Sequence, residues 1–339
     1  MMCIGIFGAS GNVGRAACTY LAKYKKDVEI LAITGKHDID LGENIKVVKS
    51  GRLTPEIADR YCGMCDVVIN CIDSDHSYMI AEAAARNDCA FIDTSGTDLL
   101  RSKLDNLKGC FVLNCGFFPG VTGVMMRYMI EKYTEEPCWS GYVGNSGALG
   151  YGAAKDMLLY MKNGFGKSST YFCNGIYKKI NTPAADDEGD YRMFFPDELK
   201  KVAGEHSDKT IRWYIKRQSK AAENILMRAG LNEKIDESLI RKLIEISGEE
   251  EEREDHIDIF AGERIETEGT GISLKVENAY SVTGMAAALT ASFLVQSDKK
   301  IRGIYNMCDL VEPSIVIDSL KNAGISLEER EVSVEEGVI

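Results

Sequence analysis

Long apolar runs and an excess of positive charge are both missing from this chain of 339 residues. No apolar run approaches the roughly 18 residues that cross a bilayer, and the first apolar stretch is too short for the core of a secretory signal peptide. Asp and Glu number 52 against 40 Lys and Arg, which gives a net charge of −12. We therefore expect neither membrane insertion nor non-specific binding to nucleic acid or anionic membranes.

A second C-x-x-C pair is also missing, although the chain has 11 cysteines. The motif Cys62 to Cys65 stands alone, whereas a zinc ribbon needs two such pairs. It precedes the apolar run 66–72 instead of following a strand, which is unlike a thioredoxin-type site. The spacing favours a structural role and no metal site, with redox or metal chemistry as the alternative. Because the other cysteines stand mainly in apolar surroundings, we expect reduced thiols and a cytoplasmic protein.

Strand-like and helix-like segments alternate through the first 120 residues. Helical patterns such as 16–24 and 79–84 separate short apolar runs, which lie at 3–7, 28–33, 46–49, 66–72, 90–93 and 110–114. Short buried strands that alternate with amphipathic helices predict an α/β fold with a Rossmann-type, doubly wound parallel sheet.

The pattern changes after Phe118-Pro119-Gly120, where a predicted helix at 124–132 leads into segments richer in glycine, aromatic residues and charge. A helix of small residues, at 284–295, follows this middle region. We predict three parts: an NAD(P)-binding Rossmann domain over 1–125, an inserted α+β domain for substrate binding or dimerisation over 126–278, and C-terminal helices that return to the first domain over 279–339.

Three glycines, Gly8, Gly11 and Gly14, directly follow the first apolar run. In a G-x-x-G-x-x-G turn the first glycine permits the turn, the second lets backbone N–H groups approach a pyrophosphate, and the third lets the helix pack against the strand. The alternative is a tight turn without a ligand. Because the triplet follows a strand and opens a helix at the start of an alternating region, we predict that it binds a dinucleotide.

The end of the second predicted strand indicates which dinucleotide. An NAD enzyme usually carries Asp or Glu there to bind the ribose 2′-hydroxyl. This chain has Thr34, Gly35, Lys36 and His37 instead, without an acid. A lysine suits the 2′-phosphate of NADP, so we predict NADP, with NAD possible and an exposed loop lysine as the alternative interpretation.

A Tyr-x-x-x-Lys spacing at Tyr151 and Lys155 is typical of short-chain dehydrogenases, where the lysine lowers the tyrosine pKa so that it acts as an acid. Tyr128 and Lys132 have the same spacing, which shows how readily it arises by chance. In that family the tyrosine helix directly follows the fifth strand, whereas here another predicted strand, 111–114, intervenes. A short-chain carbonyl reductase is therefore kept only as an alternative.

Four stretches together indicate a family. VVINC at 67–71, AFIDTSG at 90–96 and NCGFFPGVTG at 114–123 follow GASGNVGR at 8–15. In this order and spacing they resemble the saccharopine dehydrogenase-like family in its glutamate-forming branch, with its "VINC", "YVDLSG" and "GFDPG" elements. YSVT at 280–283 looks like the family's "YAMT" element.

This resemblance implies a Rossmann domain completed by C-terminal helices and an inserted domain that commonly carries a dimer interface. It also implies a nicotinamide cofactor and hydride chemistry on a secondary amine through an imine, with a small amino-acid-like substrate and a homodimer. The chain departs from the family at Phe118, which replaces the Asp of "GFDPG", and at Thr34-Gly35-Lys36, which replaces a more usual Gly-Arg.

The carboxyl ends of strands in a doubly wound sheet face the ligand crevice. We therefore expect the cofactor to contact Gly8, Ser10, Gly11, Asn12, Val13, Thr34, Gly35, Lys36, Asn70, Cys71, Gly116 and Phe117. Asp93 is the candidate catalytic carboxylate, because a cationic imine needs a nearby negative charge. Its alternative role is to cap the backbone of Ser95 and Gly96.

Substrate carboxylates need cationic anchors, and the sequence does not choose among Arg127, Lys155, Arg212 and Arg217. A binding-only redox sensor for NADP is the remaining alternative, since it needs neither anchors nor a proton-transfer group beside the nicotinamide.

Overall fold

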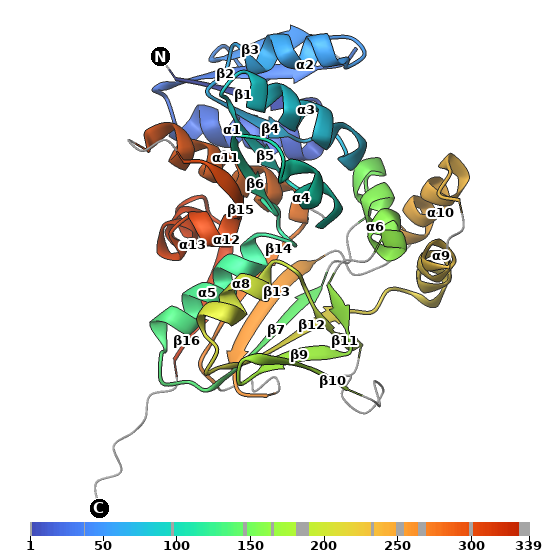
Figure 1. Cartoon of the computed structure of the whole chain (residues 1–339), viewed down its shortest axis with the longest axis vertical. Coiled ribbons are helices and arrows are strands. Elements are labelled where there is room, and N and C mark those ends of the chain that lie inside the picture. The colour runs from blue at the N-terminus through green and yellow to red at the C-terminus, as the bar shows by residue number, and fades with distance from the viewer. Residues whose placement is uncertain are drawn as a thin grey trace, which may run out of the picture.

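Two sheets, one above the other in Figure 1, organise the molecule. The computed structural model of the chain describes residues 2–36, 38–95, 98–144, 148–163, 166–180, 190–231, 234–248, 254–263, 269–297 and 301–331. No helix in these described ranges is long and apolar enough to cross a membrane.

The first sheet has seven parallel strands in the order β15-β6-β5-β4-β1-β2-β3. Their bounds are β1 Met2–Phe7, β2 Val28–Thr34, β3 Ile45–Lys49, β4 Val67–Asn70, β5 Ala90–Asp93, β6 Cys110–Leu113 and β15 Gly303–Asn306. The strand order reverses between β1 and β4, which is where ligands bind in doubly wound sheets. The predicted fold class, a Rossmann-type sheet with a second α/β unit, is confirmed.

Helices cover both faces of this sheet, as parallel strands require. Along β1, Ile4 and Ile6 point into the core under α1 and α11, whereas Phe7 belongs to the core under α2 and α3. The helices are α1 Asn12–Tyr24, α2 Pro55–Cys62, α3 Ser74–Arg86, α4 Asp98–Leu104 and α11 Ala279–Gln296. A Cβ at Gly284 of α11 would lie 2.4 Å from the Val13 carbonyl oxygen, so the glycine lets α11 pack closely on α1.

The second sheet is mixed and runs β10-β9-β12-β7-β13-β14-β16, with β11 paired to β12 and β8. Its strands are β7 Cys138–Gly144, β8 Lys167–Ser168, β9 Thr170–Cys173, β10 Ile176–Lys179, β11 Tyr191–Phe195, β12 Thr210–Lys216, β13 Asp255–Ala261, β14 Gly271–Val276 and β16 Ser326–Arg330. Helices α5 Val121–Lys132 and α8 Leu199–Glu205 lie between the two sheets in Figure 1. One apolar core continues from α1 and α11 through α5 to the buried Trp139 and Trp213.

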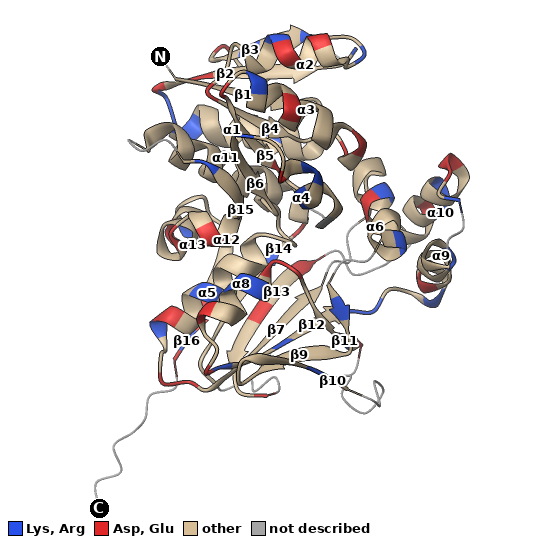
Figure 2. Ribbon diagram, in the orientation of Figure 1, with Lys and Arg blue, Asp and Glu red and all other residues tan. Residues whose placement is uncertain are grey.

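Three further helices form a small unit with an apolar core of its own, to one side of the second sheet in Figure 1. They are α6 Tyr151–Asn163, α9 Lys220–Gly230 and α10 Glu237–Ser247. Figure 2 shows acidic and basic positions interspersed over the helices of the molecule, in keeping with the absence of a basic excess in the sequence.

The C-terminal segment departs from the helices expected over 279–339. It contains α12 Met307–Leu310 and α13 Pro313–Asn322, but also β15, which extends the first sheet, and β16, which pairs with β14 of the second. These strands become recognisable only from the partners they pair with, because each has only four or five residues. The domain boundaries themselves stay a prediction.

Candidate functional site

A cleft of about 680 Å³ lies between the glycine turn of the first domain and helix α6 with strands β11 and β12 of the second. The first domain lines it with strand ends, turns and the start of α1, and the lining residues include Gly11, Asn12, Val13, Asn70, Cys71, Asp93, Phe117 and Phe118. The cleft therefore lies at the topological switch point, where the fold leads us to expect a ligand.

The glycine turn is closed by contacts that leave no room for side chains. Gly8 has φ +82°, and a Cβ there would lie 2.7 Å from the Cys71 carbonyl oxygen. A Cβ at Gly14 would lie 2.4 Å from the Gly8 carbonyl oxygen. Gly11 is the N-cap of α1 and offers no side chain to block the free N–H groups of its first turn. This cradle fits a pyrophosphate at the positive end of a 13-residue helix.

The predicted 2′-phosphate residues lie beside this turn but outside the cleft. The N–H groups of Gly8 and Ala9 donate to the Ile33 carbonyl oxygen at 3.0 and 3.2 Å, which brings Thr34 next to the turn. Thr34 is buried, whereas Gly35 and Lys36 are exposed at the end of β2. Of the other predicted contacts, Gly8, Ser10 and Gly116 also do not line the cleft.

Arg52, which sequence reasoning missed, lies at the same edge. The Ser50 N–H donates to the Thr34 carbonyl oxygen at 2.8 Å, and the Gly51 N–H donates to that of Gly35 at 3.1 Å. This pairing places exposed Arg52 beside the Thr34–Lys36 segment. Its signal in the sequence is weak, because the contact depends on the pairing of β2 with β3.

Asp93 is buried and lies in a hydrogen-bond network at the base of the cleft. Its Oδ1 accepts from the Ser95 N–H at 2.9 Å and from the Ser95 hydroxyl at 2.8 Å, and its Oδ2 accepts from the Asn70 amide at 3.2 Å. Burial raises the pKa of Asp93, and the hydrogen bonds from Ser77, Ser95 and Asn70 oppose that rise. The contact with the Ser95 backbone matches the capping alternative, while Gly96 lies outside the described residues.

Charged groups at the start of α3 tie the first domain to α6. Lys155 forms ion pairs with Asp73, at 3.4 Å, and with Asp75. Asp73 also pairs with His76 Nδ1 at 2.5 Å. Burial alone would raise the pKa of Asp73, but the hydrogen bond and charge of His76, with the charge of Lys155, outweigh it and lower the value.

Asp156 is a largely buried carboxyl that lines the cleft from α6. The hydroxyl of Ser74, at the start of α3, donates to Asp156 Oδ1 at 2.5 Å. Burial raises the pKa of Asp156 to about 6, and the charges of Asp93 and Asp73 add to the rise. A carboxyl with such a value changes its protonation state near neutral pH, as a proton-transfer group must.

The turn after β6 forms the wall between the two domains. The Phe117 N–H donates to the hydroxyl of Thr283 at 3.0 Å, so the YSVT segment of α11 contacts the turn. Phe118 stacks on Trp213 of β12, with ring centroids 6.3 Å apart. Where the "GFDPG" motif carries an Asp, this chain has Phe118, which makes an aromatic contact with the second sheet.

Arg192 extends this wall across three strands of the second sheet. Val143, Ile215 and Arg192 are in register on β7, β12 and β11, and all three line the cleft. Ile215 is two residues from Trp213 and therefore shares its face of the sheet. The half-buried Arg192 side chain makes no hydrogen bond or ion pair with any described residue. A guanidinium of this kind is a ready partner for a carboxylate.

The four cationic anchors considered from the sequence do not line the cleft. Lys155 pairs with α3, as described above. Arg127 pairs with Glu205 at 2.5 Å, and Arg212 pairs with Glu263 at 3.0 Å. No signal in the sequence singles out Arg192, because its position depends on strand pairing and no motif surrounds it.

Tyr151 lines the cleft, but its surroundings are unlike those of a short-chain dehydrogenase. Its hydroxyl donates to Glu237 Oε2 at 2.7 Å, and this hydrogen bond raises the tyrosine pKa. Lys155 is held by Asp73 and Asp75. Because short-chain chemistry needs a lowered tyrosine pKa, the geometry does not favour that alternative.

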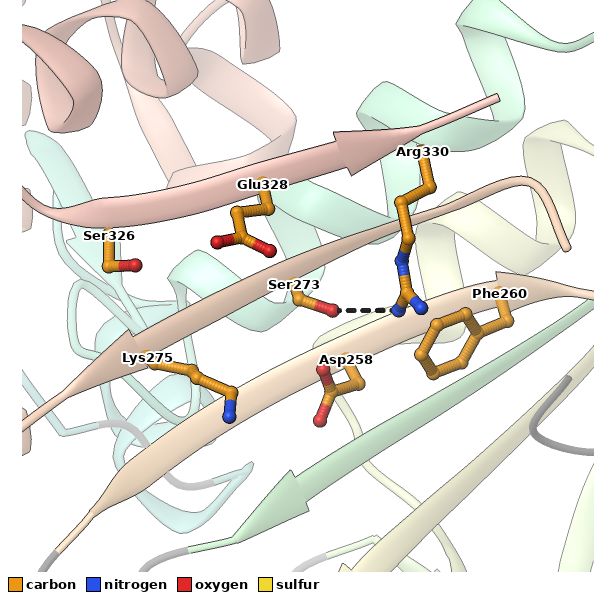
Figure 3. Close-up of a pocket in the computed structure, with 7 residues that line it drawn as sticks. All are labelled: Asp258, Phe260, Ser273, Lys275, Ser326, Glu328 and Arg330. Carbon is orange, nitrogen blue, oxygen red and sulfur yellow. Dashed lines mark hydrogen bonds between the residues drawn. The ribbon is translucent and has the colours of Figure 1, made fainter. Parts of the chain in front are cut away.

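A second hollow, of about 380 Å³, lies on the open face of β13, β14 and β16 (Figure 3). Asp258, Ser273 and Glu328 are in register across it. Arg330 donates to the Ser273 hydroxyl at 3.2 Å and lies over the ring of Phe260. No residue of the glycine turn lines this hollow. We therefore take the cleft, which the glycine turn does line, as the candidate site. No group of three metal-ligating side chains occurs within the described ranges.

Comparison with known proteins shows what the first domain and the whole fold resemble. Residues 3–105 match the model of the semialdehyde dehydrogenase NAD-binding domain. Saccharopine dehydrogenase (L-Glu forming) from Saccharomyces cerevisiae superposes with a TM-score of 0.63 at 13% identity, over 97% of this chain and 99% of that one. The chain has the fold of a saccharopine dehydrogenase.

The resemblance drawn from the motifs is thus confirmed for the fold, and the first domain is of the NAD(P)-binding kind. DAP dehydrogenase from C. glutamicum, with a TM-score of 0.47 at 14% identity, covers 95% of this chain and 98% of that one. Dihydrodipicolinate reductase from Paenisporosarcina sp. TG-14, with a TM-score of 0.45 at 11% identity, covers 92% and 100%. No curated protein matches the chain by sequence.

Proposed function

We propose that this protein is an NADP-dependent oxidoreductase that acts on the C–N bond of an amine or imine derived from an amino acid. One observation carries the proposal: a single cleft joins a dinucleotide cradle to a half-buried carboxyl, Asp156, and to the guanidinium of Arg192, which has no ion pair among the described residues. The neighbouring folds include proteins named as saccharopine and DAP dehydrogenases, which supports the choice of amine chemistry.

The preference for NADP rests on the end of β2. Lys36 and Arg52 are exposed there, and Thr34 to Lys36 include no acid that would bind a ribose 2′-hydroxyl. Two cations at this edge would attract a 2′-phosphate. NAD stays possible, because the pyrophosphate cradle does not distinguish the two cofactors.

When bound, the nicotinamide donates or accepts a hydride. The protein supplies the remaining functions. The Arg192 guanidinium holds a carboxylate of the substrate, and the aromatic wall of Phe117 and Phe118 excludes water from the reacting atoms. Asp156 gives a proton to the nitrogen during reduction and, as a carboxylate, accepts it back during oxidation.

Asp93, the candidate catalytic carboxylate, is among the residues that line the cleft. As a carboxylate it would stabilise a cationic imine, although Ser95 and Asn70 already donate to its oxygens. An Asp93→Ala variant with full turnover would remove it from the mechanism. The homodimer and the amino-acid-like substrate remain part of the proposal, and a monomeric mass in light scattering at micromolar concentration would contradict the former.

The first experiment is a paired titration with NADPH and NADH, followed by intrinsic fluorescence. We expect tighter binding of NADPH, and a protein that binds neither would refute the proposal. Amino acids paired with 2-oxo acids are then screened as substrates by following NADPH oxidation. Binding of NADPH without turnover on any such pair would favour the sensor alternative.

Arg192→Gln tests the substrate end of the cleft. Losing a charged hydrogen-bond partner of a carboxylate costs about 2–3 kcal/mol, so we expect kcat/KM to fall roughly 30- to 100-fold with the Kd for NADPH unchanged. Arg217→Gln is the matched control, because that exposed arginine does not line the cleft. Equal losses in the two variants would exclude Arg192 as the anchor.

A further inference from the structure

Four cysteines gather at the edge of the first sheet that is opposite the cleft. Cys3 lies in β1, Cys65 precedes β4, Cys89 precedes β5, and Cys62 ends α2. Because β1, β4 and β5 are parallel, their starts share one edge, about 16 Å along β1 from the glycine turn. The proposed reaction uses none of these thiols.

Two of the four sulfurs already lie close together. Cys3 Sγ and Cys65 Sγ are 3.5 Å apart in a sulfur–sulfur hydrogen bond, although 62 positions separate them in the chain. A disulfide needs about 2.05 Å, so the sulfurs would have to approach by only about 1.5 Å. The Cys65 sulfur rests over Gly5, where a Cβ would lie 2.8 Å from it.

The backbone on both sides of the pair is fixed by hydrogen bonds. The Cys3 N–H donates to Asp66 Oδ2 at 2.7 Å, and the Asp66 N–H donates to the Cys3 carbonyl oxygen at 2.9 Å. Ile4 and Val67 are then paired in register. The two sulfurs are therefore held at contact by segments that are hydrogen-bonded to each other.

The pair is also chemically unequal. The Cys65 thiol hydrogen bond lowers the pKa of Cys3 against the opposing effect of burial, whereas the pKa of Cys65 is raised well above its usual range. Cys3 is 8% exposed and Cys65 is partly exposed, so the pair lies near the protein surface. A thiol with a lowered pKa in contact with a partner thiol of raised pKa is the arrangement of a redox-active pair.

The other two cysteines are placed differently. Cys62 is fully buried and its thiol donates to the Ile80 carbonyl oxygen at 3.8 Å. Burial and the neighbouring Cys62 raise the pKa of the Cys89 thiol well above its usual value. No three of these sulfurs, among the residues that the structure describes, are arranged to hold a metal ion.

We propose that Cys3 and Cys65 form a thiol–disulfide site that hydroperoxides oxidise, linking β1 to the start of β4. The Cys3 sulfur, after losing its proton, attacks a peroxide oxygen and the O–O bond breaks. The leaving group is hydroxide, or an alkoxide from an organic hydroperoxide, and it takes up a proton to become water or an alcohol. The Cys3 sulfenic acid is then attacked by the Cys65 sulfur, the S–S bond forms, and the second oxygen leaves as water with the Cys65 proton. Two thiols lose two electrons and two protons, and the peroxide is reduced.

The bridge would close a loop of 62 positions across the two central strands of the first sheet. Cross-linking so long a loop restricts the unfolded chain. The glycine turn and Asn70 lie at the other end of these strands, so NADPH binding is expected to persist. The site therefore protects the fold under oxidation without closing the cleft.

The test exposes the full-length protein to hydrogen peroxide, alkylates the remaining thiols under denaturing conditions and maps the peptides by mass spectrometry. We expect a cross-linked peptide that contains Cys3 and Cys65 and disappears after treatment with dithiothreitol. The midpoint of thermal unfolding should be higher for the oxidised than for the reduced protein. A Cys62–Cys65 bridge, or two free thiols at Cys3 and Cys65 after oxidation, would overturn the proposal.

Cys65→Ser and Cys3→Ser should each abolish the cross-link and the rise in thermal midpoint. Cys173→Ser is the matched control, because Cys173 is a partly exposed cysteine whose pKa is lowered by hydrogen bonds from Thr210 and Lys178. The control should keep both effects. Should Cys3→Ser not fold, Cys65→Ser and the wild-type peptide map decide the question.

Discussion

The two walls of the cleft are built from different parts of the chain. The first-domain wall is mainly backbone: Gly8 and Gly14 make a turn that no side chain would fit, and the N-terminal end of α1 faces the cleft. The second-domain wall is mainly side chains, with Asp156 on α6 and Arg192 on β11. A cofactor shared by many proteins is recognised through backbone geometry, while a particular substrate is recognised through side chains brought from separate elements.

The strongest disruption of the backbone wall is expected from Gly14→Ala. The Cβ of the alanine would lie 2.4 Å from the Gly8 carbonyl oxygen, and the backbone cannot move aside as a flexible side chain can. We expect NADPH binding to weaken by at least about 100-fold, or about 2.7 kcal/mol, in the same fluorescence titration. Gly204→Ala is the control, because nothing lies within 4 Å of its Cβ. Normal NADPH affinity in Gly14→Ala would disprove the close packing.

Glu198 joins the start of α8 to the start of α5, and its replacement tests that connection. This fully buried carboxyl at the start of α8 accepts from the Gly120 N–H at 2.6 Å and from the Thr122 hydroxyl. Burial raises its pKa to about 7, opposed by these hydrogen bonds.

Because the folded protein then binds a proton more tightly than the unfolded chain, stability should fall as pH rises from about 4.5 to 7, by up to about 3 kcal/mol. Glu198→Gln stays neutral and should lose that part of the pH dependence. Chemical denaturation at several pH values measures the difference. Identical profiles for the variant and the wild type would show that Glu198 is ionised throughout.

Asp156→Asn tests the side-chain wall. The amide cannot transfer the proton, so we expect kcat/KM in the reductive direction to fall roughly 100-fold. In the wild type kcat/KM should decline above about pH 6, where the carboxyl loses its proton, and the variant should lose that inflection. NADPH affinity should be unchanged, and an inflection that persists in Asp156→Asn belongs to another group.

The smallest expected effect on cofactor binding is that of replacing Lys36, at the edge of the first-domain wall. Lys36→Glu places a negative charge where the 2′-phosphate is expected and should weaken NADPH binding roughly 10-fold, or about 1.4 kcal/mol, while NADH binding changes little. Lys26→Glu, at an exposed position before β2, controls for overall charge. Equal losses for NADPH and NADH would remove Lys36 from the 2′-phosphate site.

The sequence predicted the first domain well because its signals are local. Strand runs, intervening helices and the triplet Gly8, Gly11, Gly14 all fall within short stretches, and the structure brings Gly11, Asn70 and Asp93 to one cleft as expected. The carboxyl ends of parallel strands meet at one edge, so a strand that is recognised also locates its final residues.

The second-domain side chains of the cleft and the strand β16 could not be predicted from the sequence, for reasons that differ by residue. Arg192 lines the cleft because β11 pairs with β12, and Asp156 has a raised pKa because the folded chain buries it. Lys155 looked like part of a catalytic pair by spacing, yet its charge is taken up by Asp73 and Asp75. β16 was not expected at all, since five residues reveal a strand only when a partner is present.

By itself, then, the sequence determined the parallel sheet, the glycine cradle and the absence of an acid at the end of β2, because each depends on residues close together in the chain. Only the tertiary structure decided which cations and carboxyls reach the cleft and which two cysteines touch. Those outcomes depend on burial and on pairing between distant segments, and both exist only once the chain has folded.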